Sequence, residues 1–241
     1  MKILVVVVSF IAFLLVALSG PLHRFGLIDL GTAFMGFQYS VYVGIAALVL
    51  LTLLFVVQIR SKRKIVTFTS AAIVIIFSAI AIIIPVGMLN KGEAVPPIHD
   101  ISTDLVNPPK FDSIASLRAD SPNPITYAGA ASAEQQRQAY PELKTLVYSQ
   151  PKAELVAAVE QATKNLGWAL VDTDVSKGKI EATDTTTWFG FKDDIVVRVN
   201  DTVDQREVDI RSKSRIGASD LGKNAERIHD FIKELDKVLG E

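Results

Sequence analysis

Apolar residues gather in three long runs at the start of the chain. The runs occupy residues 3–18, 41–59 and 65–89, and none of them contains a charged residue. A helix of about 20 apolar residues crosses the roughly 30 Å hydrocarbon core of a bilayer, so the second and third runs are predicted to span a membrane. The first run is shorter. We interpret it as an uncleaved span; the alternative is a signal peptide, because Lys2 precedes it and small residues follow it.

The next stretch, residues 90–150, lacks this apolar pattern and is rich in proline. Prolines lie at Pro96, Pro97, Pro108 and Pro109. Proline fixes its own φ angle and biases the residue before it toward extended backbone. The stretch is therefore predicted to be an extended strap and linker that lies along the domain that follows it.

A regular pattern returns in residues 151–241. Apolar residues at steps of three and four predict a helix after Pro151 and a second helix that ends near Leu239. Between the helices lie four strand-like segments, at residues 168–172, 179–185, 194–200 and 206–212. In the last segment, Val208 and Ile210 alternate with charged residues, which predicts a strand with one buried face.

These elements define the predicted fold class, which is α+β. Three N-terminal transmembrane helices in residues 1–89 are followed by a soluble domain with a four-stranded antiparallel sheet flanked by two helices. The links between the strands are short, which favours antiparallel pairing. The order helix, four strands, helix places both helices on one face of the sheet.

Charge is divided unevenly between the two halves of the chain. Residues 1–89 carry six basic residues and one acid, whereas residues 90–241 carry 19 basic and 25 acidic residues. Arg60, Lys62, Arg63 and Lys64 fill the link between the second and third runs, and basic residues near span ends stay on the cytoplasmic side. Residues 90–241 are therefore predicted to lie on the non-cytoplasmic side, which is the periplasm in a Gram-negative bacterium.

The same charges narrow the classes of partner. An acidic outer domain is repelled by phosphate backbones, so no nucleic-acid partner is predicted. The chain contains no cysteine, which excludes disulfides and Cys-ligated zinc. No cofactor is predicted. The expected partners are the lipid bilayer and either an envelope protein or a small anionic ligand.

Three motifs resemble a known family. They are residues 98–104 (IHDISTD) with 107–109 (NPP), residues 188–194 (WFGFKDD) and residues 212–224 (SKSRIGASDLGKN). Together they resemble the family called domain of unknown function 1499, and the resemblance covers most of residues 95–230. Because that family has no established activity, the resemblance supports the architecture and implies no chemistry.

The first candidate site lies in the strap. His99, Asp100 and Asp104 combine an imidazole with carboxylates, which are groups that ligate a metal or act as an acid and base pair. The alternative is structural: short polar side chains hydrogen-bond backbone groups and fix the strap.

The second candidate site is the turn before the last helix. The predicted ligand-binding residues are Arg211, Ser214, Arg215, Ser219 and Asn224. Backbone amides at the start of a helix, with arginines nearby, make a site for an anion. Asp220 brings a negative charge to the same place, so the alternative is a structural network that docks the strap onto the helix.

The leading functional hypothesis is a non-enzymatic, membrane-anchored module whose outer domain binds a partner or ligand. It follows from the acidic outer domain, the three spans and the lack of a nucleophile and base constellation. The alternative hypothesis is a hydrolase or transferase that uses His99, Asp100 and Asp104. A transporter is disfavoured, because the spans lack the ionisable residues that translocation pathways use.

Overall fold

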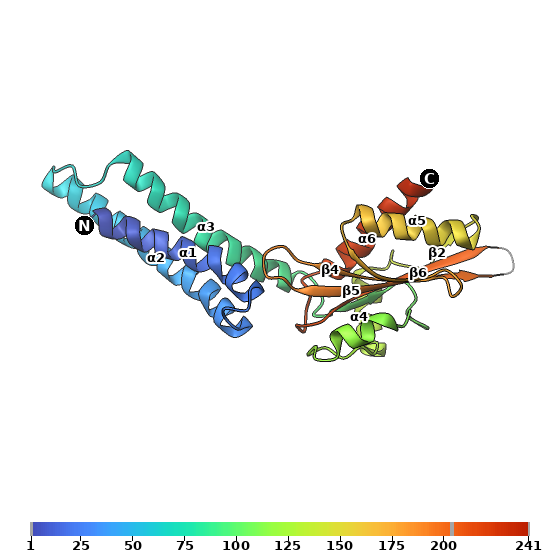
Figure 1. The fold of residues 1–241 in the computed structure, drawn as a ribbon. Coiled ribbons are helices and arrows are strands. Elements are labelled where there is room, and N and C mark those ends of the chain that lie inside the picture. The colour runs from blue at the N-terminus through green and yellow to red at the C-terminus, as the bar shows by residue number, and fades with distance from the viewer. Residues whose placement is uncertain (1, 203–204, 241) are drawn as a thin grey trace. The chain divides into compact units, whose positions relative to one another are not determined.

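The computed structural model describes residues 2–202 and 205–240, and it divides into two compact units (Figure 1). Unit 1 comprises Met1–Lys91 and Thr187–Gly190, and unit 2 comprises Gly92–Thr186 and Phe191–Glu241. The end residues 1 and 241 of the predicted ranges lie outside the described residues.

Unit 1 contains three helices that are long and apolar enough to cross a membrane. They are α1 (Lys2–Arg24), α2 (Leu30–Ser61) and α3 (Phe68–Glu93). α1 and α2 are longer than their predicted apolar runs, whereas α3 begins three residues after the start of its run and ends four residues beyond it. Asp29 begins α2 by accepting a hydrogen bond from the Thr32 amide at 2.9 Å, which satisfies one of the unpaired donors of the first turn.

Small residues bring α2 close to α3. Ser40 on α2 donates a hydrogen bond to the carbonyl oxygen of Ala81 on α3 at 3.0 Å, and Gly44 lies against the same part of α3. Close approach of backbones at small residues is how helices pack where no water drives association. Large apolar side chains such as Ile59 and Phe68 remain exposed, as expected for surfaces that face lipid.

Unit 2 is built on a six-stranded antiparallel sheet with the order β1-β6-β5-β4-β3, in which β2 also pairs with β6. The strands are β1 (Asp100–Ser102), β2 (Leu146–Tyr148), β3 (Ala169–Asp174), β4 (Lys179–Thr185), β5 (Lys192–Asp201) and β6 (Arg206–Ser214). The four predicted strands are present as β3 to β6. The predicted number of strands was wrong, because β1 and β2, of three residues each, are too short for any periodicity.

Two helices cover one face of this sheet (Figure 1). They are α5 (Lys152–Asn165) and α6 (Lys223–Leu239). Their apolar stripes pack on alternate residues of the central strands to form the main core, which includes Leu155, Val159, Val197, Ile210, Ile228 and Phe231. This is the arrangement that the periodicity predicts.

α3 continues to Glu93, so the strap of the folded domain comprises residues 94–150. It adds β1 and β2 to the sheet beside β6, and residues 103–139 cover the opposite face of the sheet. The strap also contains a 3-10 helix η1 (Ser113–Arg118) and a short helix α4 (Ala130–Ala139), which Figure 1 shows across the sheet from α5 and α6. As a result β6 has two buried faces. Ile210 is 0% exposed, but Asp209 and Arg211 are only 1% and 2% exposed. The prediction of one buried face was wrong, because alternating charges do not show that a strap covers them.

Candidate functional site: a buried charged layer under the strap

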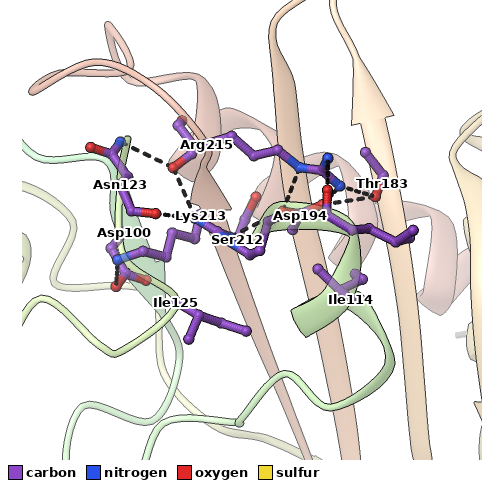
Figure 2. Close-up of polar contacts among 12 residues, drawn as sticks. Asp100, Ile114, Asn123, Ile125, Thr183, Asp194, Ser212, Lys213 and Arg215 are labelled. Carbon is purple, nitrogen blue, oxygen red and sulfur yellow. Dashed lines mark hydrogen bonds and ion pairs between the residues drawn. The ribbon is translucent and has the colours of Figure 1, made fainter. Parts of the chain in front are cut away.

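The strap and the sheet meet through two buried aspartates, one from each side. Asp100 of β1 belongs to the strap and is 0% exposed. Arg211 of β6 holds it with two hydrogen bonds, from Nε at 2.8 Å and from Nη2 at 3.0 Å. Lys213, two residues further along the same face of β6, donates its Nζ to Asp100 at 2.8 Å (Figure 2). Asp100 therefore fastens the strap to two cations of the sheet.

The second aspartate belongs to the sheet and binds a cation of the strap. It is Asp194 of β5, which is 0% exposed. It accepts from Arg118 of the strap at 3.0 Å. It also accepts from both Nε and Nη2 of Arg215, at 2.9 and 2.8 Å (Figure 2). Thr183 of β4 donates a further hydrogen bond at 2.8 Å. A buried charge must be paired and hydrogen-bonded to offset the cost of its desolvation. Two cations and a hydroxyl meet this requirement for Asp194.

The spare N–H groups of these cations bind the backbone of the strap. Arg211 donates to the carbonyl oxygens of Pro109 and Ile125, each at 3.1 Å. Lys213 donates to the carbonyl oxygen of Thr126 at 3.0 Å, and Arg215 to that of Leu117 at 2.7 Å. A buried irregular segment must pair its carbonyl groups with some donor. Here the donors are basic side chains of the sheet.

Carboxylates of the layer bind the strap's amides in the same way. Glu181 of β4 is 1% exposed and accepts from the amides of Asp112 and Ile114, at 2.6 and 2.8 Å. These amides lie at the start of η1, where a helix leaves donors unpaired and favours a negative charge. Asp100 likewise accepts from the amide of Ala128 at 3.0 Å.

Aromatic rings enclose one of the cations. The guanidinium carbon of Arg211 lies 5.0 Å from the ring centroid of Phe111 and 5.3 Å from that of Tyr127, both from the strap. These distances are within the range of cation–π attraction. Burial, reinforced by the negative charge of Asp100, raises the pKa of Tyr127 to about 12. Tyr127 is therefore neutral at physiological pH.

Burial and charge act in opposition on the central ions. Burial alone would raise the pKa of Asp100, but the hydrogen bonds and charges of Arg211 and Lys213 outweigh it, so its pKa lies below the usual value. Burial lowers the pKa of Lys213, and the neighbouring Arg211 and Arg118 act in the same direction. Asp100 opposes both effects, because its negative charge favours the protonated form of the lysine and so raises its pKa.

A second polar network lies at the edge of the helix-covered face. Asn224 of α6 is 0% exposed and donates to the Ser214 hydroxyl at 3.0 Å and to the His99 carbonyl oxygen at 3.1 Å. Its own carbonyl oxygen accepts from Ser212 at 2.6 Å and from Arg227 at 2.7 Å. All four hydrogen bonds of the amide group bind protein groups, so Asn224 joins the strap, β6 and α6.

The start of α6 already holds an anion, and it is a side chain of the chain itself. Asp220 accepts from the amides of Gly222 at 2.7 Å and Asn224 at 2.9 Å. Ser219 accepts from the Leu221 amide at 3.2 Å. Burial is the main reason that the pKa of Asp220 is raised, although both amides act against the rise. The amides predicted to bind an external anion are thus occupied by a carboxylate.

The five predicted ligand-binding residues do not form one group. Arg211 and Arg215 enter the strap-covered layer, whereas Ser214 and Asn224 join the network on the helix-covered side, and Ser219 caps the turn. The pleat of β6 separates Arg211 from Ser214, because side chains at odd and even positions of a strand point to opposite faces, whereas Ser219 and Asn224 lie beyond the strand. The prediction grouped these residues because they are close in the sequence, but in the folded chain they lie on different faces and elements.

The three predicted strap residues also have separate partners. His99 contacts the Ala218 carbonyl oxygen through Nδ1 at 3.3 Å, and Asp104 pairs with Arg198 at 2.9 Å, while Asp100 is held as described above. Asp104 also accepts from the amides of two following residues, so it fixes a turn. Within residues 2–202 and 205–240, no three His, Cys, Asp or Glu side chains are grouped so that they could hold a metal ion.

Sequence reasoning missed the residues that complete the layer, which are Arg118, Glu181, Asp194 and Lys213. One signal was available. From Glu207 to Ser214, charged residues alternate with apolar or small residues along β6, and a long proline-rich segment without its own periodicity precedes the domain. A strand with a charged face, preceded by a long segment that forms few regular elements of its own, indicates that the segment covers the charged face.

The fold and the layer define a class of protein: an α+β domain with a charged sheet face sealed by its own strap, carried on three apolar helices. The family described as "Protein of unknown function (DUF1499)" matches residues 100–235. The chain belongs to this family, which confirms the resemblance of the motifs. Comparison with curated proteins gives no match.

Proposed function

We propose that the chain is a membrane-anchored binding or scaffold module whose C-terminal domain lies on the non-cytoplasmic side. One observation carries the proposal. The polar groups that the sequence offers for a ligand are directed at the chain's own strap and helix start, as with Arg211 on Asp100 and Asp220 on the α6 amides. Groups used in this way stabilise a rigid domain, and recognition is left to its outer surface.

The most exposed apolar side chain of the strap gives this surface a candidate contact. Val106 is 96% exposed, yet its turn is fixed, because Asp104 accepts from its amide at 2.9 Å and also binds Arg198 at 2.9 Å. Arg198 in turn pairs with the buried Asp209 at 2.8 Å. A rigid turn loses little conformational entropy on binding, so it suits contact with a protein partner in the envelope.

The proposed side of the membrane rests on the basic link between α2 and α3. Its four cations favour the cytoplasmic side, and α3 then runs outward to unit 2. The chain has no cysteine, so single cysteines can be introduced without background labelling. In intact cells, Val106→Cys should react with a membrane-impermeant maleimide, whereas Lys62→Cys should react only after lysis. The reverse pattern would overturn the proposed side.

The same cysteine tests binding. A thiol-linked photoreactive group at Val106→Cys should crosslink a discrete protein in intact membranes. Lys177→Cys is the matched control, since the Lys177 side chain is 68% exposed and belongs to another turn. Crosslinking at neither position would argue against a protein partner. Substrate turnover that disappears in His99→Ala would replace the proposal with the hydrolase or transferase hypothesis.

A further inference from the structure

The folded chain collects basic residues at one end of the helices of unit 1. We call this group the basic end; its members are Lys2, Arg60, Lys62, Arg63 and Lys64. Lys2 begins α1 far away in the sequence from the other four. It nevertheless lines the same small hollow as Val66, and Val5 belongs to the same apolar cluster as Val66. The start of α1 therefore lies beside the link between α2 and α3.

The link is an ordered structure. The side-chain oxygen of Gln58 accepts from the amides of Ile65 and Val66, at 2.8 and 2.7 Å. Thr67 and Ser70 exchange hydrogen bonds at the start of α3, including one of 3.1 Å from the Thr67 amide to the Ser70 hydroxyl. With its backbone fixed and Val66 buried, the link holds its basic side chains on the outside, where all of them are exposed.

Acids of the same unit do not neutralise the basic end. Asp29 is the single acid in residues 1–91, and it caps the opposite end of α2. A helix of the 32 residues of α2 is about 48 Å long, so Asp29 is far beyond the distance of about 4 Å at which an ion pair forms. Among the described residues, none of the five cations forms an ion pair. Their counter-ions must come from outside the chain.

Exposed apolar residues adjoin these cations. Ile3, Ile59 and Phe68 are 72%, 75% and 89% exposed and lie next to Lys2, Arg60 and the link. In a bilayer such side chains contact acyl chains, which places the neighbouring cations at the depth of the headgroups. We propose that the basic end binds the phosphate groups of anionic phospholipids, with the acyl chains against Ile3, Ile59 and Phe68.

The test uses the full chain in nanodiscs that contain equal amounts of phosphatidylglycerol and phosphatidylcholine. Lipids that stay bound after detergent release are counted by native mass spectrometry. Both membrane faces are open in a nanodisc, so the outcome does not depend on the side occupied by unit 2 in the cell. Wild-type protein should retain phosphatidylglycerol over phosphatidylcholine by about tenfold, since each cation near an anionic surface adds several-fold. The enrichment should fall as salt is raised.

Variants test whether the cations of the basic end bind the anionic lipid. Lys62→Gln, Arg63→Gln and Lys64→Gln combined should reduce the enrichment to near unity. Lys62→Arg with Lys64→Arg, which keeps the charge, should preserve it. The matched control removes three exposed cations of unit 2, through Lys177→Gln, Lys223→Gln and Lys233→Gln, and should behave as wild type. Equal enrichment in the first variant, with helix content unchanged, would overturn the proposal, and so would equal retention of both lipids by wild type.

Discussion

The two faces of the sheet in unit 2 are both buried, but they are buried by different means. Under α5 and α6 the sheet presents mainly aliphatic side chains. Under the strap it presents mainly Arg, Lys, Asp and Glu, and Val196 forms a small apolar cluster there with Phe111 and Ile114. The difference follows from what covers each face. A helix pairs its own backbone groups, so the sheet below it needs only apolar contacts. The strap is mostly irregular, so its carbonyl and amide groups take their partners from charged side chains of the sheet.

The two faces should also contribute differently to stability. Apolar burial contributes directly to the free energy of unfolding. Buried ion pairs contribute less, because desolvation offsets much of their attraction, although breaking one by removing a single partner is costly. The charged layer therefore fixes where the strap lies, while the helix-covered core supplies most of the stability.

The largest expected effect comes from Asp194→Ala. It leaves Arg118 and Arg215 without their anion, and side chains of 1% and 14% exposure are then charged and unpaired. The free energy of unfolding should fall by about 3–5 kcal/mol. Hydrogen–deuterium exchange of the detergent-solubilised chain measures it, with the Asn123 amide as a reporter because it donates to the Arg215 carbonyl oxygen.

A substitution on the other face provides the comparison. Ile228→Ala removes a fully buried side chain of α6 and should cost about 2–5 kcal/mol. Its loss of protection should be greatest in α6 and the central strands, whereas Asp194→Ala should expose the strap first. If both variants lose protection in the same order, the strap and the helices unfold as one cooperative unit and the two faces are not energetically distinct.

A smaller effect is expected from Glu181→Gln. The carboxylate accepts from two strap amides, and glutamine has one carbonyl oxygen with which to replace it, so one amide faces an NH₂ donor. The free energy of unfolding should fall by about 1–3 kcal/mol, and the Asp112 and Ile114 amides should exchange faster. Glu134→Gln is the control, since the Glu134 side chain is exposed and its ion pair with Arg137 contributes little to stability. Unchanged exchange at η1 would show that Glu181 does not hold the strap.

This contrast explains what could be predicted from the sequence. Three- and four-residue spacing identified α5 and α6, and alternation identified β3 to β6, because both patterns come from burial against one apolar core. β1 gave no such signal. Its three residues pair with β6 through backbone hydrogen bonds, and the side chain that fixes it, Asp100, is polar. Polar contacts between segments far apart in the sequence leave no periodicity.

The candidate site shows the same limit. Arg211, Arg215 and Asn224 form hydrogen bonds within the fold, and no spacing rule pairs Arg215 with Asp194 rather than with Asp220. That choice is made by the register of β5 on β6, which places Asp194 opposite Lys213. The register is a property of the folded sheet, and charges within a single segment do not determine it.

The smallest effect, and the one that depends on pH, concerns Asp220 at the junction of the two faces. Its pKa is raised, chiefly by burial, so the folded state binds its proton more tightly than the unfolded state. The corresponding stability is fully present below the unfolded pKa of about 3.9 and is lost as pH rises through the higher folded pKa. Asp100 has a lowered pKa, so its contribution to stability is present above its unfolded pKa and is lost only as pH falls through the lower folded pKa.

Asp220→Asn keeps one acceptor for the amides of Gly222 and Asn224 but does not titrate. At neutral pH the variant should be within about 1 kcal/mol of wild type, because the lost cap is offset by relief from burying a charge. Near pH 4, wild type should become the more stable protein. Amide exchange in the first turn of α6, followed from acid to neutral pH, measures the difference. If the stability of wild type relative to the variant instead increases as pH rises, the charge of Asp220 stabilises the helix start by more than its burial costs. The charge at this junction would then be compensated, as the charges on the strap-covered face are.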